Sequence, residues 1–251
     1  MNTITKIEWV ALSIVAVCFL TYSIMHHRAS STYSLEAYLT KQKDFIRLRD
    51  AQDILTNGNN GDLVFFCGDT KGERTCRWCT GSIFSHVALL FREVHPETYE
   101  NILYVWEADV GHKSKRGPRI MKLEDKLRRY HGYHCLMWRK LHTSDGCEIP
   151  STEKILKVVE RYKHLEFDDS MMSWWFSNTC IYNLIKNKNT VFCSELIALT
   201  LQSEYISMMN NDHVPAYYSP NTFTNTHITG LKEGYTYEAG TYIDYSSLRK
   251  K

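Results

Sequence analysis

Four short apolar segments between residues 62 and 141 constrain the fold more than any other feature of the sequence. They are DLVFFC (62–67), SHVALLFREV (85–94), ILYVWEA (102–108) and HCLMWRKL (134–141). Their length and their β-branched and aromatic residues are typical of strands. Between the third and fourth segments, RGPRIMKLEDKLRRY predicts a short strand and then a helix. The middle of the chain is therefore expected to form a sheet.

Two helices are predicted after these strands. STEKILKVVERYKHLEF (151–167) starts with two capping residues and continues with apolar residues at helical spacing. The second helix begins at Asn189 or Thr190, either of which can cap it, and continues to about Tyr205. Its apolar residues occupy more than one face, which favours a central position. Strands followed by helices indicate an α+β fold.

The N-terminal segment WVALSIVAVCFLTYSIM (9–25) contains no charged residue. About 17 residues at 1.5 Å each just cross a hydrocarbon core of roughly 30 Å. Trp9 and Tyr22 lie near its two edges, where aromatic rings prefer the membrane interface. A cleaved signal peptide is the alternative, but no small-x-small cleavage site follows. The preferred interpretation is a single transmembrane helix that anchors the chain.

The charges around this segment favour a cytosolic body. Arg28, Lys41 and Lys43 follow the segment, whereas Lys6 and the terminal amine precede it. The chain has no Asn-x-Ser/Thr glycosylation sequon, and the seven cysteines outside the segment do not indicate a disulfide framework. The net charge of +2 gives no support to nucleic-acid binding. The expected partner is a membrane.

Composition and turn signals divide the chain into four parts. The predicted boundaries are 1–28 for the anchor, 29–60 for an amphipathic helix and linker, 61–225 for the main domain and 226–251 for a tail. The amphipathic helix is expected near 34–55, because apolar residues recur there at helical spacing and the turn signal NGNNGD follows.

A thiol, an imidazole and a carboxylate lie at positions that suit nucleophilic catalysis. Cys193 lies in the first turn of the second predicted helix, where the helix dipole and a nearby imidazolium favour the thiolate. His86 starts the second predicted strand, and Glu107 closes the third. If these strands pair antiparallel, His86 and Glu107 become neighbours. Each residue alone is more often structural than catalytic, so the hypothesis depends on the three together.

The pattern GDLVFF, SHVALLF, VWEA, FDDSM, FCSELIA and YSPNTF resembles the circularly permuted papain-like fold of the NlpC/P60 superfamily, in the branch of YiiX-like proteins and a poxvirus family. The resemblance covers about residues 61–225, and its cysteine follows its histidine. It implies Cys193 as nucleophile, His86 as base and Glu107 as third member. It also implies a small antiparallel sheet or barrel that packs against the cysteine helix.

Three alternatives stay open. The unusual stretch CGDTKGERTCRWCTG (67–81) suggests a structural zinc site of Cys67, Cys76, Cys79 and His86, which would occupy the proposed base. The same fold also allows a binding module without catalysis. The third alternative is a membrane-tethered scaffold that uses the apolar cluster MMSWWF (171–176) as its docking patch. The same cluster equally fits a substrate lid, a contact with the bilayer surface or simple core packing.

The sequence therefore predicts a membrane-anchored cysteine hydrolase or acyltransferase that needs no cofactor. Its expected substrates are amides, esters or thioesters, and the anchor makes lipid-linked or acylated substrates plausible partners. The bond that it cleaves and the final acyl acceptor are left open by these residues.

Overall fold

The computed structural model describes residues 48–68, 70–80, 82–110, 116–130, 132–168, 187–225 and 227–249. The chain divides into two units, 1–43 and 44–251, and all described residues belong to the second unit. The predicted transmembrane segment 9–25 and the apolar cluster 171–176 lie outside the described residues. Within those residues, no helix has the length and the apolar character that crossing a membrane requires.

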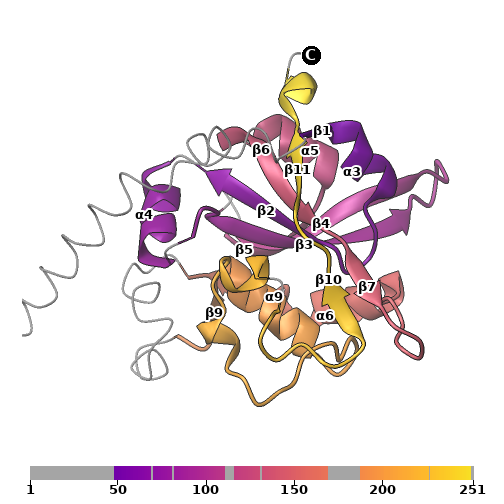
Figure 1. Ribbon diagram of the computed structural model, residues 1–251, viewed down its shortest axis with the longest axis vertical. Helices are drawn as coiled ribbons and strands as arrows, with labels where there is room; N and C mark the ends of the chain where they lie inside the picture. Colours follow the sequence, from indigo (N-terminus) through magenta and orange to yellow (C-terminus); the bar gives the residue numbers. More distant parts are fainter. Residues whose placement is uncertain are drawn as a thin grey trace, which may run out of the picture. The chain divides into compact units, whose positions relative to one another are not determined.

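A seven-stranded sheet forms the centre of the second unit (Figure 1). Its strands, in spatial order, are β1 (Arg49–Asp50), β11 (Thr241–Asp244), β6 (Gly132–Arg139), β2 (Leu63–Gly68), β3 (His86–Val94), β4 (Asn101–Asp109) and β5 (Gly117–Lys122). β1 runs parallel to β11, and the other neighbours are antiparallel. All four apolar segments predicted as strands are confirmed as strands of this sheet.

Two short strand pairs lie outside the main sheet. β7 (Leu141–Thr143) pairs antiparallel with β10 (Tyr235–Tyr237), and β8 (Glu166–Phe167) pairs parallel with β9 (Thr190–Val191). The second pair matters for the site, because β9 leads directly into the helix that carries Cys193.

Helices cover both faces of the sheet (Figure 1). Within the described residues, the helices are α3 (Ala51–Asn57), α4 (Lys71–Thr80), α5 (Leu123–Arg129), α6 (Thr152–Tyr162) and α9 (Cys193–Gln202), with short 3-10 turns η1 (Pro215–Tyr217), η2 (Thr222–Thr224) and η3 (Ser246–Arg249). α3 and α5 pack on one face, whereas α6 and α9 lie on the other. The α+β class expected from the sequence is confirmed.

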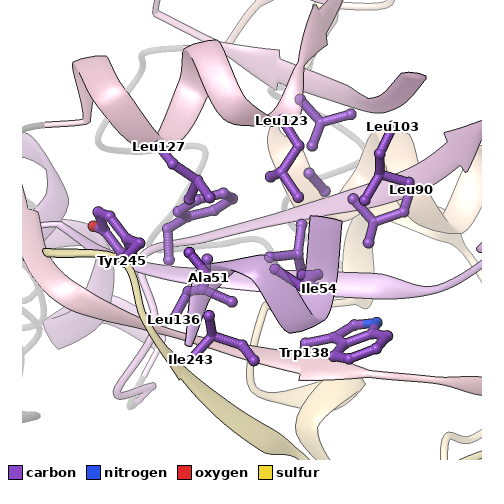
Figure 2. Packing of buried hydrophobic residues seen from close by; sticks show 14 residues of the cluster. Ala51, Ile54, Leu90, Leu103, Leu123, Leu127, Leu136, Trp138, Ile243 and Tyr245 are labelled. Atoms are coloured by element: carbon purple, nitrogen blue, oxygen red, sulfur yellow. The ribbon is translucent and has the colours of Figure 1, made fainter. Parts of the chain in front are cut away.

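Alternate residues along each strand supply the two cores. One face contributes a cluster with α3 and α5, seen from close by in Figure 2. Its buried members are Ala51, Ile54, Val64, Phe66, Ala88, Leu90, Leu103, Val105, Leu123, Leu127, Leu136, Trp138, Ile243 and Tyr245. On the opposite face, the indole Nε1 of Trp106 donates to Thr200 Oγ1 at 3.0 Å, which joins β4 to α9. The cysteine helix therefore packs against the antiparallel strands β3 and β4, in agreement with the expected packing.

The amphipathic helix predicted near 34–55 needs correction in its described part. Residues 49–50 form β1, and α3 starts only at Ala51. The carboxylate of Asp50 accepts a hydrogen bond from Gln52 N at 2.8 Å, so Asp50 caps a new helix instead of continuing an earlier one. The apolar spacing in the sequence did not show that a short strand at residues 49–50 precedes α3.

The main sheet also extends beyond the domain predicted at 61–225. β1 comes from the predicted linker, and β11 comes from the predicted tail. Ile243 and Tyr245 from that tail are completely buried in the core. Their burial makes this tail part of the folded domain.

Candidate active site

His86 and Glu107 meet at one end of the sheet. His86 is the first residue of β3, and Glu107 lies near the end of β4. Leu89 pairs with Trp106, and this register places Glu107 on the same face of the sheet as His86. The imidazole Nε2 lies 2.7 Å from Glu107 Oε2. The antiparallel pairing predicted from the sequence therefore brings the two side chains into contact.

Cys193 is the first residue of α9, so it lies in the first turn as predicted, but the helix starts later than the predicted cap at Asn189 or Thr190. Thr190 cannot cap this helix because it lies in β9, and its hydroxyl donates to Asn187 O at 2.9 Å. Phe192 occupies the N-cap position without a side-chain capping bond. The thiol thus lies at the very start of a helix, where free amide groups and the helix dipole favour negative charge.

The thiol also reaches the imidazole. Cys193 lies close enough to His86 to help raise its pKa, and the Sγ of Cys193 lies 4.0 Å from the carbonyl oxygen of Ser85, the residue before His86. The exposed fraction is 5% for Cys193, 8% for His86 and 0% for Glu107. The structure thus places all three predicted site residues close together, with Cys193 and His86 lining one cavity.

The pair of His86 and Glu107 is held in its charged form. Burial and the charge of Lys126 oppose protonation of His86, but its bonds to Cys193 and Glu107 and the Glu107 charge raise its pKa to about 10. Burial also disfavours a charged Glu107, yet Lys126 and His86 hold the pKa of this carboxyl well below its usual range. An imidazolium therefore faces a carboxylate at neutral pH.

Two cations surround Glu107 from behind. Lys126 Nζ lies 2.9 Å from both carboxylate oxygens. Arg119 donates to Glu107 Oε1 from Nε at 3.1 Å and from Nη2 at 3.0 Å. Both cations also contact Asp109 Oδ2, Arg119 at 2.5 Å and Lys126 at 2.8 Å. His86 and Glu107 thus belong to a larger charged cluster that also contains Asp109, Arg119 and Lys126.

A cavity of about 300 Å³ opens beside the sulfur. Cys193, His86 and Ser194 line it, together with Asp109, Arg119 and Lys126 of the charged cluster. Its remaining lining is both polar and apolar: Thr70, Gly72, Glu73, Cys76, Thr80, Ser85, Val110, Arg129, Tyr130, Phe167, Phe192, Ser219 and Pro220. The volume lies at the lower end of the range for small-molecule sites, so the cavity suits a small ligand or part of a larger one.

The helix α4 forms one wall of this cavity. Glu73 Oε1 accepts a hydrogen bond from the hydroxyl of Tyr130 at 2.8 Å, and Glu73 Oε2 accepts one from Thr70 Oγ1 at 2.7 Å. Cys76 Sγ lies 3.5 Å from Ser85 O, the same carbonyl that Cys193 approaches. The stretch 67–81, which looked foreign to the resemblance, therefore contributes directly to the candidate site.

The sequence did not identify Lys126, Arg119 or Asp109 as site residues. A usable signal was present, since Glu107 and Asp109 are two residues apart and so lie on one face of a strand. A buried carboxylate beside a partly buried one requires cations, and the basic stretch that follows supplies them. Glu73 and Tyr130 gave no such signal, because they are 57 positions apart and meet only in the folded chain.

The alternative zinc site is not supported by the residues that can be checked. Cys67 Sγ accepts a hydrogen bond from Arg77 Nη1 at 3.2 Å, whereas His86 contacts Glu107 and Cys193. The side chain of Cys79 lies outside the described part. Among described side chains, Cys67, Cys76 and His86 do not form a group that could hold a metal ion. The zinc site of Cys67, Cys76, Cys79 and His86 therefore stays an untested alternative, and among the described side chains His86 contacts Glu107 instead.

The fold and the site define an α+β protein with a Cys–His–Glu constellation at the end of an antiparallel sheet. No family model and no curated protein matches the chain. Its structure is similar to the crystal structure of the metalloprotein YiiX from Escherichia coli O157:H7, with a TM-score of 0.44 and 15% identity. The match covers 72% of this chain and 96% of that chain. The permuted papain-like family stays a prediction from the sequence.

Proposed function

We propose that this chain is a cysteine hydrolase or acyltransferase of the permuted papain-like kind. The observation that carries the proposal is the position of the His86 imidazole, whose Nε2 lies 2.7 Å from the Glu107 carboxylate and which lines one cavity together with Cys193. A nucleophile, a base and a group that orients the base are the parts that covalent catalysis requires.

The proposed reaction begins at the sulfur. An imidazolium at His86 stabilises a thiolate at Cys193, which attacks the carbonyl carbon of an amide, ester or thioester. His86 then donates its proton to the leaving amine, alcohol or thiol as the tetrahedral intermediate collapses to an acyl-enzyme. Water or another acceptor gives a proton to His86, attacks the acyl group and regenerates the thiol.

The start of α9 supports this chemistry. The first amide groups of any helix lack partners within the helix, and no side chain caps α9. The amide of Cys193 is therefore a donor for the oxygen that becomes negative in the tetrahedral intermediate. Glu107 would hold the imidazole in the orientation that this attack needs.

The substrate class follows from the cavity and from the sequence. Val110, Phe167, Phe192 and Pro220 give the cavity an apolar part beside its charged part, which suits an acyl group attached to a polar carrier. We further propose that segment 9–25 anchors the chain in a membrane with its body in the cytosol. Lipid-linked or acylated substrates would then lie within reach.

A thiol-directed activity probe tests the proposal. In the full chain, the Cys193→Ala substitution should abolish labelling by an electrophilic acyl-type probe, while circular dichroism stays unchanged. Cys147→Ala is the matched control, because Cys147 is partly exposed outside the cavity, and it should leave the labelling intact. Mass spectrometry should place the acyl adduct on Cys193. Equal labelling of wild type and Cys193→Ala would defeat the proposal.

A further inference from the structure

Two carboxylates and two cations form a compact cluster behind the histidine. Glu107 and Asp109 are two residues apart on β4 and so lie on one face of the strand. Arg119 is the direct partner of Glu107 on β5, and Lys126 reaches the same place from α5. Each cation contacts both carboxylates at distances between 2.5 and 3.1 Å. The cluster is therefore shared between a sheet and a helix.

Lys126 is the buried member of the two cations. Its side chain is 5% exposed, whereas that of Arg119 is 23% exposed. Its ammonium lies 5.3 Å from the ring centre of Phe66 and 5.5 Å from that of Tyr130. A lysine is rarely buried unless its charge is paired. Here the pairing consists of Glu107 and Asp109 together, so the ammonium is held by both carboxylates at once.

We propose that Lys126 is a positioning residue of the candidate active site, which fixes the Glu107 carboxylate against His86 and keeps Glu107 and Asp109 charged side by side. This inference rests on the proposed function. Without Lys126, Glu107 and Asp109 would share Arg119 alone, and Glu107 would lose the ammonium that contacts both of its oxygens. The Glu107 carboxylate would then hold the imidazole of His86 less firmly in its orientation.

Lys126 acts on His86 in a second way as well. The charged and titratable groups that face the imidazole are Cys193 from α9, Glu107 and Asp109 from β4, and Lys126 from α5. The thiol and the two carboxylates favour the imidazolium, and the ammonium opposes it. Lys126 therefore limits how tightly His86 holds the proton that it must give to a leaving group. A merely structural lysine would leave that proton affinity unchanged.

The first test compares Lys126→Met with Arg128→Met, two changes that remove one positive charge from the same helix. Arg128 is exposed and pairs with Glu124, away from the cluster. In full-length protein, Lys126→Met should lower kcat/KM by about 10- to 100-fold, the size expected when a catalytic group is slightly misplaced. It should also move the alkaline limb of the pH profile to higher pH. Arg128→Met should change neither quantity.

A second measurement does not depend on activity. Histidine side-chain NMR, recorded in a Cys193→Ala background with and without Lys126→Met, reports the titration of His86 directly. The loss of the ammonium should raise the pKa of His86. An unchanged or lowered value would overturn the role of Lys126, even if the chain proves to be an enzyme. A raised value in a chain without activity would instead support the role and refute the proposed function.

A double variant covers the case in which Lys126→Met does not fold. Lys126→Met combined with Asp109→Asn removes one charge of each sign and leaves Arg119 paired with Glu107. If Lys126 exists to balance two carboxylates, the double variant must be more stable than the single variant and must recover part of its activity. A double variant that is less stable than Lys126→Met would overturn the proposal.

Discussion

The imidazole Nε2 of His86 lies 2.7 Å from Oε2 of Glu107, a carboxylate with no exposure to solvent. This contact joins the start of β3 to the end of β4. Glu107 also pairs with Lys126 and Arg119, so one carboxylate both orients the imidazole and helps to balance two cations. A substitution at Glu107 should therefore affect both roles.

The change Glu107→Gln should damage both activity and stability. An amide in place of a buried carboxylate lets the histidine take the wrong tautomer, which lowers kcat by about 10⁴-fold in a comparable triad. It also leaves Lys126 and Arg119 to share Asp109, and breaking a buried ion pair costs about 3–5 kcal/mol. Urea unfolding and hydrolysis assays measure the two effects. Glu97→Gln, on an exposed turn, should affect neither, and a fully active Glu107→Gln variant would exclude the triad role.

Stability should fall as the pH rises from about 6.5 to about 10. The pKa of His86 is raised from 6.5 to about 10 by folding, so the folded state binds a proton that the unfolded state has already lost in this range. The stabilisation is fully present below pH 6.5 and is lost as the pH approaches 10. Urea midpoints measured across this range should decline in wild type. His86→Gln should remove most of the decline, and an equally steep decline in that variant would contradict the assignment.

Local signals in the sequence predicted that His86 and Glu107 lie side by side. Two apolar segments with a turn between them give an antiparallel pair, and that pair alone places His86 beside Glu107. Local signals placed Cys193 only near the start of a helix, and its position beside His86 was implied by the resemblance to the permuted papain-like fold. The predicted cap at Thr190 was wrong, because Thr190 lies in β9 and pairs with Glu166 of β8. The residues next to Thr190 in the sequence give no sign of this pairing.

The remainder of the site depends on long-range packing. Lys126 enters the cluster only because Leu123 and Leu127, on either side of it, bury α5 against the sheet. β11 reaches the sheet from a tail in which short strands carry little periodicity. Such contacts join residues that are far apart in the sequence, so the spacing of residues does not encode them.

Gly68 leaves room for the Glu73 carboxylate. A Cβ at position 68 would lie 1.8 Å from Glu73 Cδ, so Gly68→Ala must push this carboxylate away from the Tyr130 hydroxyl. The loss of this partly buried bond should cost about 1–3 kcal/mol. Gly72→Ala is the matched control, because nothing lies within 4 Å of its added Cβ and alanine favours the helix.

A mutant cycle checks the reason for the Gly68 effect. If the clash with Glu73 is the cause, Gly68→Ala should be nearly neutral in a Glu73→Ala background. Thermal unfolding of the wild type, the two single variants and the double variant gives the coupling energy. Additive effects would show that Gly68 is required for another reason.

Arg139 ties the C-terminal part of the chain to the sheet. It is 1% exposed, and its guanidinium donates to four backbone carbonyls at 2.5 to 3.0 Å: those of Phe223, Asn225, Tyr237 and Glu238. The first two follow closely on Ser219 and Pro220, which line the cavity. Arg139→Met should therefore destabilise the protein by about 3–5 kcal/mol, because it leaves four carbonyls without their charged donor.

The same substitution at Arg161 provides the comparison. Arg161 makes an exposed ion pair with Glu204 at 2.8 Å, and the loss of such a pair costs about 1 kcal/mol or less. Urea unfolding should therefore separate Arg139→Met from Arg161→Met by several-fold in free energy. Arg139→Lys should rescue little, since one ammonium cannot reach four carbonyls that a planar guanidinium spans. If Arg139→Met proved as stable as Arg161→Met, the C-terminal segment would have to be held by its buried apolar residues alone.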